Sequence, residues 1–161
     1  QIALQPPLRI DSVLQDGIMQ EVKRDGKAWF IDLTEEQPVG TSKSITVWYS
    51  GKPRVAARPP WDGGIAWKKD NNGNPFAASA CQGIGASVWW PCKDHMYDEP
   101  DSMRISVRVP KGLMNVSNGR LERTESHPDS STTYHWAVHN PINNYGVNIN
   151  IGAYVHGADV P

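Results

Sequence analysis

The chain has 161 residues, of which 39% are hydrophobic, so it is long enough for one well-packed domain and short for two. Sixteen basic and 17 acidic residues leave a formal net charge of −1, with no run of like charges, which argues against nucleic acid or an anionic membrane as a partner. No apolar stretch approaches the roughly 18 residues of a membrane span.

The N-terminus carries neither the basic nor the apolar region of a signal peptide. Because the chain does not begin with Met, we expect it to be a trimmed chain or a fragment, so the lack of an export signal here leaves export open.

Fourteen glycines and 13 prolines interrupt the chain too often for an amphipathic helix of ordinary length, whereas short runs of alternating polarity predict an all-β fold. Two antiparallel sheets packed as a β-sandwich, or saddle-like curved sheets, would bury one face of each strand. In chain order, the expected strands are Leu8–Val13, Ile18–Lys23, Ala28–Leu33, Ser44–Tyr49, Met103–Val109, Tyr134–Val138 and Val147–Val155.

The stretch from about Pro59 to Asp101 departs from this regular pattern. It is rich in Trp, Gly, Pro and acidic residues, and it contains the long polar turn Lys69–Pro75. We interpret it as a long irregular insertion in an otherwise regular β domain. Such insertions commonly carry binding residues, so this segment is where we look for function.

His135 and His139 imitate the outline of a zinc-binding H-E-x-x-H motif, but Trp136 stands where the motif requires Glu. The alternation of Tyr134, Trp136 and Val138 places both histidines on a strand. Residues four apart on a strand lie roughly 13 Å apart, which is too far for one metal ion to bridge.

Gly83 and Gly85 resemble a phosphate-binding loop only superficially, because no βαβ unit surrounds them. The simpler interpretation is that they allow the backbone to approach a neighbouring strand or a ligand.

Acidic residues crowd the region that follows, in a spacing that fits no EF-hand loop. We interpret them as caps and turn-formers, with a glycosidase pair left open; they are Asp94, Asp98, Glu99 and Asp101.

Cys81 and Cys92 are too few for a disulfide framework, and we expect them to be reduced.

Seven tryptophans are many for this length. Trp136 fits a core position, whereas those in the irregular segment either fill gaps or line a site; they are Trp61, Trp67, Trp89 and Trp90. Asn115-Val116-Ser117 fits the glycosylation sequon.

The string Ala80–Asp94, followed by Asp98–Asp101, resembles the N-terminal domain of the zinc metallo-aminopeptidases that include aminopeptidase N and the leukotriene hydrolase. A Cys-Gln pair, a Pro-Cys-x-Asp motif and the later Ser117–Gly119 turn occur in the family order. Trp61–Gly64 and Pro141–Tyr145 look like a bacterial branch of that family. The resemblance covers nearly the whole chain.

The resemblance implies a single non-catalytic domain over residues 1–161, because the family's zinc-binding helix and transition-state Tyr have no counterpart in this sequence. It implies no cofactor in this chain and Zn in a parent enzyme. The implied partners are the catalytic domain of the same polypeptide and the N-terminus of a peptide substrate. For a bacterial relative the resemblance favours export to the periplasm or beyond, with the cytoplasm as the alternative.

The family motif also implies three substrate-binding positions. Gln82 matches the position that hydrogen-bonds the free α-amino group of the substrate, and its amide oxygen is able to accept from an ammonium. Ala80 matches a position that lines the pocket for the first side chain, where relatives often carry Gln. Gly83 follows them in the same loop.

Two other functions stay open on the sequence. A stand-alone β-sandwich that binds carbohydrate would use Trp61, Trp67, Trp89 or Trp90 as a platform. An inactive relative retained for protein contacts would expose an apolar face where a catalytic domain otherwise docks.

Overall fold

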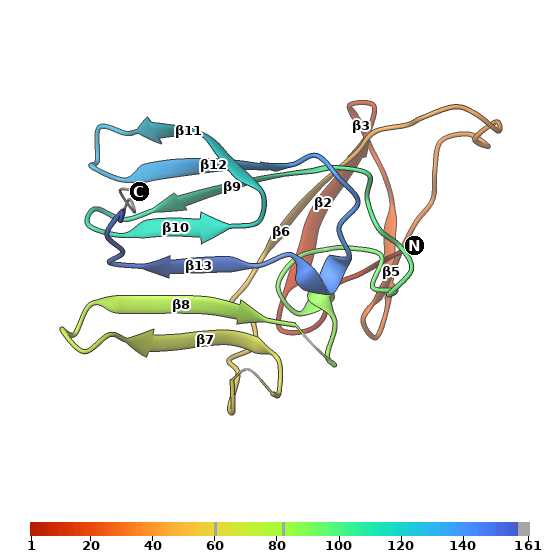
Figure 1. The fold of residues 1–161 in the computed structure, drawn as a ribbon. Coiled ribbons are helices and arrows are strands. Elements are labelled where there is room, and N and C mark those ends of the chain that lie inside the picture. The colour runs from red at the N-terminus through yellow and green to blue at the C-terminus, as the bar shows by residue number, and fades with distance from the viewer. Residues whose placement is uncertain (60, 82, 158–161) are drawn as a thin grey trace.

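A computed structural model describes residues 1–59, 61–81 and 83–157 (Figure 1). These residues form an all-β fold of antiparallel sheets, which confirms the predicted fold class. The strands are β1 (Ile2–Ala3), β2 (Arg9–Gln15), β3 (Ile18–Met19), β4 (Val22–Asp25), β5 (Ala28–Ile31), β6 (Ile45–Ser50), β7 (Gly64–Lys69), β8 (Pro75–Ala80), β9 (Met103–Val109), β10 (Met114–Ser117), β11 (Arg120–Ser126), β12 (Thr132–Val138) and β13 (Ile149–Gly152).

Within the described residues the strands form four sheets, with the orders β11-β12-β9, β10-β13-β8-β7, β3-β2-β6 and β1-β5-β4. The first two lie together on the left of Figure 1 and the other two on the right. Two 3₁₀ helices, η1 (Ala86–Val88) and η2 (Asn144–Gly146), contact each other between the two halves. These short turns are the only helices in the described part of the chain, which therefore holds no candidate helical membrane span.

Strand β9 shows why alternating sequence forms a sheet with one covered face. Ile105 and Val109 are buried and the even-numbered residues are exposed, as the pattern predicted. The neighbouring strand β12 pairs with β9 over its whole length, from Thr132 opposite Val109 to Val138 opposite Met103. The predicted strands that became β2, β6 and β12 are likewise present.

The predicted strand Ile18–Lys23 is wrong as a single element. Ile18 and Met19 form β3, which pairs with β2, whereas Val22–Asp25 forms β4, which pairs with β5 in another sheet. The backbone N–H of Gln20 still bonds to Val13 before the chain crosses between the sheets. Polarity does not alternate strictly here, because the apolar pair Ile18 and Met19 is followed by the polar pair Gln20 and Glu21 at the crossing.

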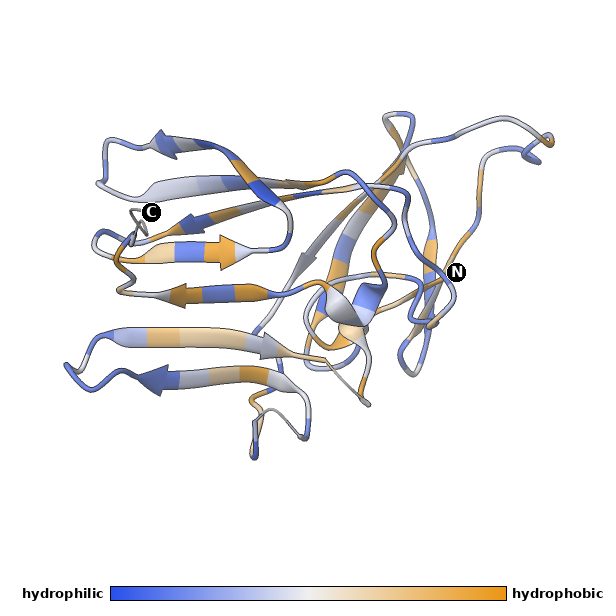
Figure 2. Cartoon of the chain, viewed as in Figure 1, coloured by the Kyte–Doolittle hydropathy of each residue, from blue (hydrophilic) through white to orange (hydrophobic). Residues whose placement is uncertain are grey.

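The prediction of an irregular insertion from Pro59 to Asp101 is only partly right. Its first half contains the regular hairpin β7–β8, joined through the polar turn that follows Lys69. The sequence did not reveal these strands because Ile65 and Ala66 are both buried, and because β8 consists mostly of alanine and serine. In Figure 2, β8 is pale and shows no alternation between strongly hydrophilic and strongly hydrophobic colours. The irregular part is the segment from Cys81 to Asp101.

The predicted strand Val147–Val155 is too long. Strand β13 ends at Gly152, and Val155 is 92% exposed. Strands β1, β10 and β11 were not predicted either. The expected Ser117–Gly119 turn connects β10 to β11, but the two strands belong to different sheets, where β10 pairs with β13 and β11 pairs with β12. Strand β11 is exposed along its whole length and therefore shows no alternation of buried and exposed residues.

The N-terminal segment forms a small core between the sheets. Leu4 and Leu8 pack with Trp29, whose indole N–H donates to the Leu4 carbonyl at 3.1 Å. Ile2, Ile10 and Val22 pack around them. Strand β1, which pairs with β5 through only two residues, is thus also held in place by buried apolar side chains.

This core predicts the effect of truncating Leu4, which is fully buried. Leu4→Ala should lower the free energy of unfolding by about 2–5 kcal/mol, because it removes buried methyl groups and leaves a cavity. Urea denaturation of the 161-residue chain measures this. Val39→Ala, at a fully exposed position, is the control and should change stability by less than about 0.5 kcal/mol. Equal effects of the two variants would contradict the assigned core.

Candidate functional site

The candidate site is built on the loop that follows β8. After Ala80 the chain turns back on itself, and the backbone N–H groups of Ile84 and Gly85 donate to the carbonyl of Cys81 at 3.3 and 2.9 Å. Helix η1 then begins at Ala86. This turn presents the backbone of residues 83–85 at the surface, beside the end of β8.

A cavity of about 470 Å³ opens beside this loop. Three segments distant in sequence form its walls: the loop itself, the segment after Cys92, and η2, with one side chain from the N-terminal half. The lining residues are Lys27, Cys81, Gly83, Ile84, Gly85, Asp94, His95, Met96, Asn144 and Tyr145.

The Asp94 side chain holds the loop through hydrogen bonds. Its side chain is only 12% exposed and accepts from the Ala86 backbone N–H at 3.2 Å and from the Ser87 hydroxyl at 2.6 Å. The Lys27 ammonium lies 3.9 Å from the same carboxylate. The interpretation of Asp94 as a turn-forming carboxylate is therefore confirmed.

Gly85 is required by this arrangement. Its φ of +90° is unfavourable for other residues, and a Cβ atom there would overlap the Asp94 carboxylate. The expectation that the loop glycines permit a close approach is thus confirmed for Gly85, and the group that approaches is a side chain of the protein itself.

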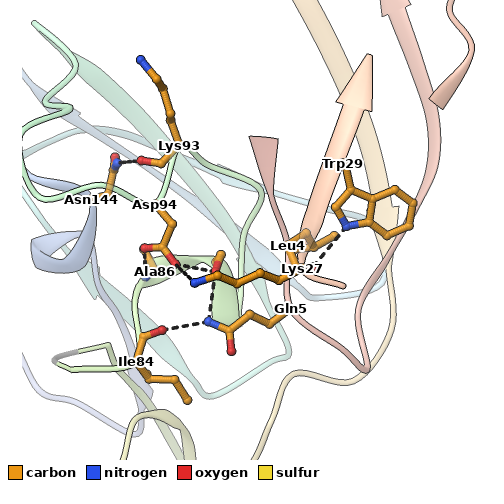
Figure 3. Close-up of polar contacts among 10 residues, drawn as sticks. Leu4, Gln5, Lys27, Trp29, Ile84, Ala86, Lys93, Asp94 and Asn144 are labelled. Carbon is orange, nitrogen blue, oxygen red and sulfur yellow. Dashed lines mark hydrogen bonds and ion pairs between the residues drawn. The ribbon is translucent and has the colours of Figure 1, made fainter. Parts of the chain in front are cut away.

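Gln5 ties the loop to the N-terminal segment (Figure 3). Its side-chain amide donates to the Ile84 carbonyl at 2.8 Å and to the Ser87 hydroxyl at 3.0 Å. Its backbone N–H donates to the Ser87 carbonyl at 2.9 Å. These contacts span about 80 positions of sequence, and no local pattern around Gln5 signalled them.

Two further contacts fix the far end of the loop. Ala3 and Cys92 exchange backbone hydrogen bonds of 2.7 and 3.1 Å. The buried Asn144 of η2 donates its side-chain amide to the Lys93 carbonyl at 2.5 Å. The loop is therefore rigidly supported on both sides, which is a requirement for a site that positions a ligand.

Of the three predicted substrate-binding residues, two lie in the described part of the chain. Ala80 ends β8 and is half-buried, and Gly83 lines the cavity. Gln82 lies outside the described residues. Sequence reasoning missed Lys27, Asn144 and Tyr145 as cavity walls, because each comes from an element far along the chain.

The prediction that both histidines lie on a strand holds for His135 only, because β12 ends at Val138. His135 is in β12 and contacts the Ser106 hydroxyl at 2.8 Å, and His139 follows the end of that strand. Residues 1–59, 61–81 and 83–157 contain no group of three His, Cys, Asp or Glu side chains placed to hold a metal ion.

The tryptophans fall into two groups. Trp61 and Trp67 are 84% and 51% exposed. Trp89 and Trp90 are half-buried, with ring centroids 6.1 Å apart and planes tilted by 57°, so they form no flat platform.

The sequon residue Asn115 is 1% exposed and donates to the Asn150 carbonyl, which makes it inaccessible in the folded chain.

The fold is similar to that of M1 zinc metallopeptidases. The structure of the M1 zinc metallopeptidase from Deinococcus radiodurans matches 94% of this chain with a TM-score of 0.79 at 16% identity. A mutant of the Deinococcus radiodurans protein bound to a Tyr-Ser-Ala substrate gives a TM-score of 0.78 at 17% identity over 94% of the chain. A two-domain M1 zinc metallopeptidase mutant bound to L-arginine gives the same values.

Each match covers 34% of the other protein, so this chain spans about a third of the length of the metallopeptidase structures that it resembles. At this level of identity the likeness establishes a shared fold. No protein-family model and no curated protein sequence matches the chain.

The Asp94 contacts predict a stability effect. Asp94→Ala should lower the free energy of unfolding by about 1.5–3 kcal/mol, since hydrogen bonds to a charged group are lost and their donors are left inside the loop. Asp98→Ala is the matched control, because Asp98 makes one exposed ion pair with Lys93 and should cost about 0–1 kcal/mol. Similar midpoints in urea for the two variants would show that Asp94 does not hold the loop.

The cysteines predict a pH dependence. Cys81 and Cys92 are free and buried, and burial raises their pKa from 9.0 to about 11 and about 12, respectively. Folding therefore favours the neutral thiols, and this contribution is complete below pH 9 and is lost as the pH rises toward 11 and 12. At pH 8 a thiol reagent should label neither cysteine until urea unfolds the chain. Rapid labelling of the native chain would contradict this.

Proposed function

We propose that this chain is the N-terminal, substrate-facing domain of a zinc-dependent aminopeptidase, and that it shapes the active-site cleft without carrying out the chemistry. The observation that carries the proposal is the fold shared with M1 zinc metallopeptidases over 94% of this chain but only 34% of theirs. The order of motifs from Ala80 to Asp101 in the sequence supports it.

The zinc chemistry would belong to another part of the polypeptide. The described residues do not fit a zinc site, because they hold no suitable group of ligands. A zinc ion in a partner domain would polarise the scissile carbonyl and activate water. The role that remains for this chain is recognition of the substrate.

The loop at the end of β8 would supply that recognition. Gln82 would accept a hydrogen bond from the free α-amino group of the peptide, and Ala80 and Gly83 would line the space for its first residue. Supporting this role, Asp94, Ser87 and Gln5 hold the following turn through side-chain bonds of 2.6–3.2 Å, so the loop would need little ordering when substrate binds. The small Ala80 would leave more room than the Gln found in relatives.

The proposal is tested on a longer protein that contains this chain. We expect chelator-sensitive release of N-terminal residues from peptides by the longer protein and none by residues 1–161 alone. In that protein, Gln82→Ala should raise KM and lower kcat/KM by about 10- to 100-fold for substrates with a free amino group, or about 1.4–2.7 kcal/mol.

Gln37→Ala is the matched control, because Gln37 lies on an exposed loop and, among the described residues, its side chain bonds only to the Thr41 carbonyl. It should leave the kinetics unchanged. Unchanged kinetics for Gln82→Ala would refute the role of Gln82, and activity insensitive to chelator would refute the zinc aminopeptidase assignment.

A carbohydrate-binding module is the second candidate, favoured by the exposure of Trp61 and Trp67. In that case the 161-residue chain itself should change its tryptophan fluorescence when a glycan is added. A flat response across a panel of glycans would count against it.

A further inference from the structure

A second surface, at the outer edge of β7, is separate from the candidate site. Strand β7 is the last strand of the β10-β13-β8-β7 sheet and lies along its lower margin in Figure 1. An edge strand presents unpaired backbone N–H and C=O groups to any extended segment that approaches it.

The first half of this edge is already occupied. The Ile65 N–H donates to the Arg54 carbonyl at 2.8 Å, and the Ala56 N–H donates to the Ile65 carbonyl at 3.1 Å. The segment around Val55 thus forms a parallel bridge to Ile65 and then leaves the sheet.

The second half of the edge is open. Backbone groups alternate in direction along a strand, so those of Trp67 and Lys69 point outward like those of Ile65. The register agrees, because Lys69 lies opposite Pro75, which has no N–H to donate. No described residue bridges to β7 beyond Ile65 on this side.

An apolar groove lies beside this open edge. It has a volume of about 650 Å³ and is lined by Gly51, Lys52, Pro53, Val55 and Trp67. Val55 and Trp67 are 50% and 51% exposed. A bound strand along β7 would direct every second side chain toward the face that carries Trp67.

The surroundings of the groove are basic, although the whole chain is nearly neutral. The stretch from 51 to 70 holds five basic residues, all exposed, and none forms an ion pair with another described residue. Both acidic residues of the stretch are engaged locally: Asp62 accepts from the Ala57 N–H and Asp70 from the N–H groups of Asn72 and Asn74. The five are Lys52, Arg54, Arg58, Lys68 and Lys69.

We propose that the open edge of β7 is a strand-addition site for an extended acidic peptide segment whose alternate side chains are apolar. The backbone of the segment would pair with Trp67 and Lys69. One of its apolar side chains would enter the groove against Trp67 and Val55, and its carboxylates would pair with the free lysines. Strand addition of this kind takes its affinity from backbone hydrogen bonds and its specificity from side-chain pockets.

Two other occupants fit the surface less well. In a second copy of this chain paired antiparallel through β7, with Trp67 opposite Lys69, each Lys68 would face the Lys68 of the other copy, and like charges directly opposite destabilise a strand pair. An acidic polysaccharide would use the cations but not the backbone groups, which lie at the spacing of a strand.

The experiment measures fluorescence polarisation of a short labelled, acetylated peptide that alternates glutamate and valine, titrated with the 161-residue chain. Lys69→Pro removes the outward N–H without removing a bond to β8, and Lys69→Ala removes the charge while keeping that N–H. We expect Lys69→Pro to weaken binding by about tenfold and Lys69→Ala by about threefold or less. Trp67→Ala should weaken it by about tenfold through loss of the groove.

The peptide itself supplies the controls. A peptide with glutamates and valines in separate blocks, and one methylated at its backbone nitrogens, should each bind at least about tenfold more weakly. Equal binding of these peptides, or equal effects of the two Lys69 variants, would overturn the proposal. Binding of polygalacturonate that depends on Trp67 but is insensitive to Lys69→Pro would assign the surface to polysaccharide instead.

Urea midpoints confirm that each variant is folded, and the methylated peptide tests the proposal on the unaltered chain. This experiment measures peptide binding to the chain and does not measure peptide hydrolysis. A negative binding result would therefore leave the proposed aminopeptidase role standing, and a negative hydrolysis result would leave the β7 binding site standing.

Discussion

The carboxylate of Asp94 is the group on which the organisation of the candidate site depends. It accepts from the first N–H of η1 and from the Ser87 hydroxyl, and Ser87 in turn receives the amide of Gln5. A carboxylate that is largely shielded from water is stable only when such donors surround it. The same bonds that satisfy Asp94 therefore fix the direction in which the chain leaves the turn after β8.

This network joins segments that are far apart in the sequence. The N-terminal segment contributes Gln5 and the backbone of Ala3, while η2 contributes Asn144 from the other end of the chain. Leu4 lies between Ala3 and Gln5 in the buried cluster with Trp29. Burial of one side chain and hydrogen bonding of its neighbours thus stabilise the loop together, and an exposed loop of small residues gains a defined shape.

The two surfaces of interest differ in how they are built. The cavity beside Gly83 has walls from several elements and a carboxylate, Asp94, that already accepts hydrogen bonds from its neighbours. The edge of β7 consists of one strand, an apolar groove and cations that have no partners among the described residues. The first is suited to holding a small group in a fixed position and the second to binding an extended segment.

The sequence by itself determined the fold class and the approximate positions of the strands that alternate in polarity, such as β9 and β12. Residues such as Ile105 and Val109 alternate with polar neighbours because one face of β9 is covered, and that local period is legible without a structure. The sequence also indicated the loop after Ala80 as a candidate site, and the interpretation of Asp94 as a turn-former is confirmed by its hydrogen bonds.

Only the tertiary structure decided the rest. The β7–β8 hairpin was hidden because Ile65 and Ala66 are covered on both faces of their strand, which removes the alternation. The alternation is interrupted after Met19, but which sheet each half of the segment joins is set by the distant strands that it pairs with. The role of Gln5 and the open edge at Trp67 depend on which distant segments meet, and such contacts are set by global packing and leave no period in the local sequence.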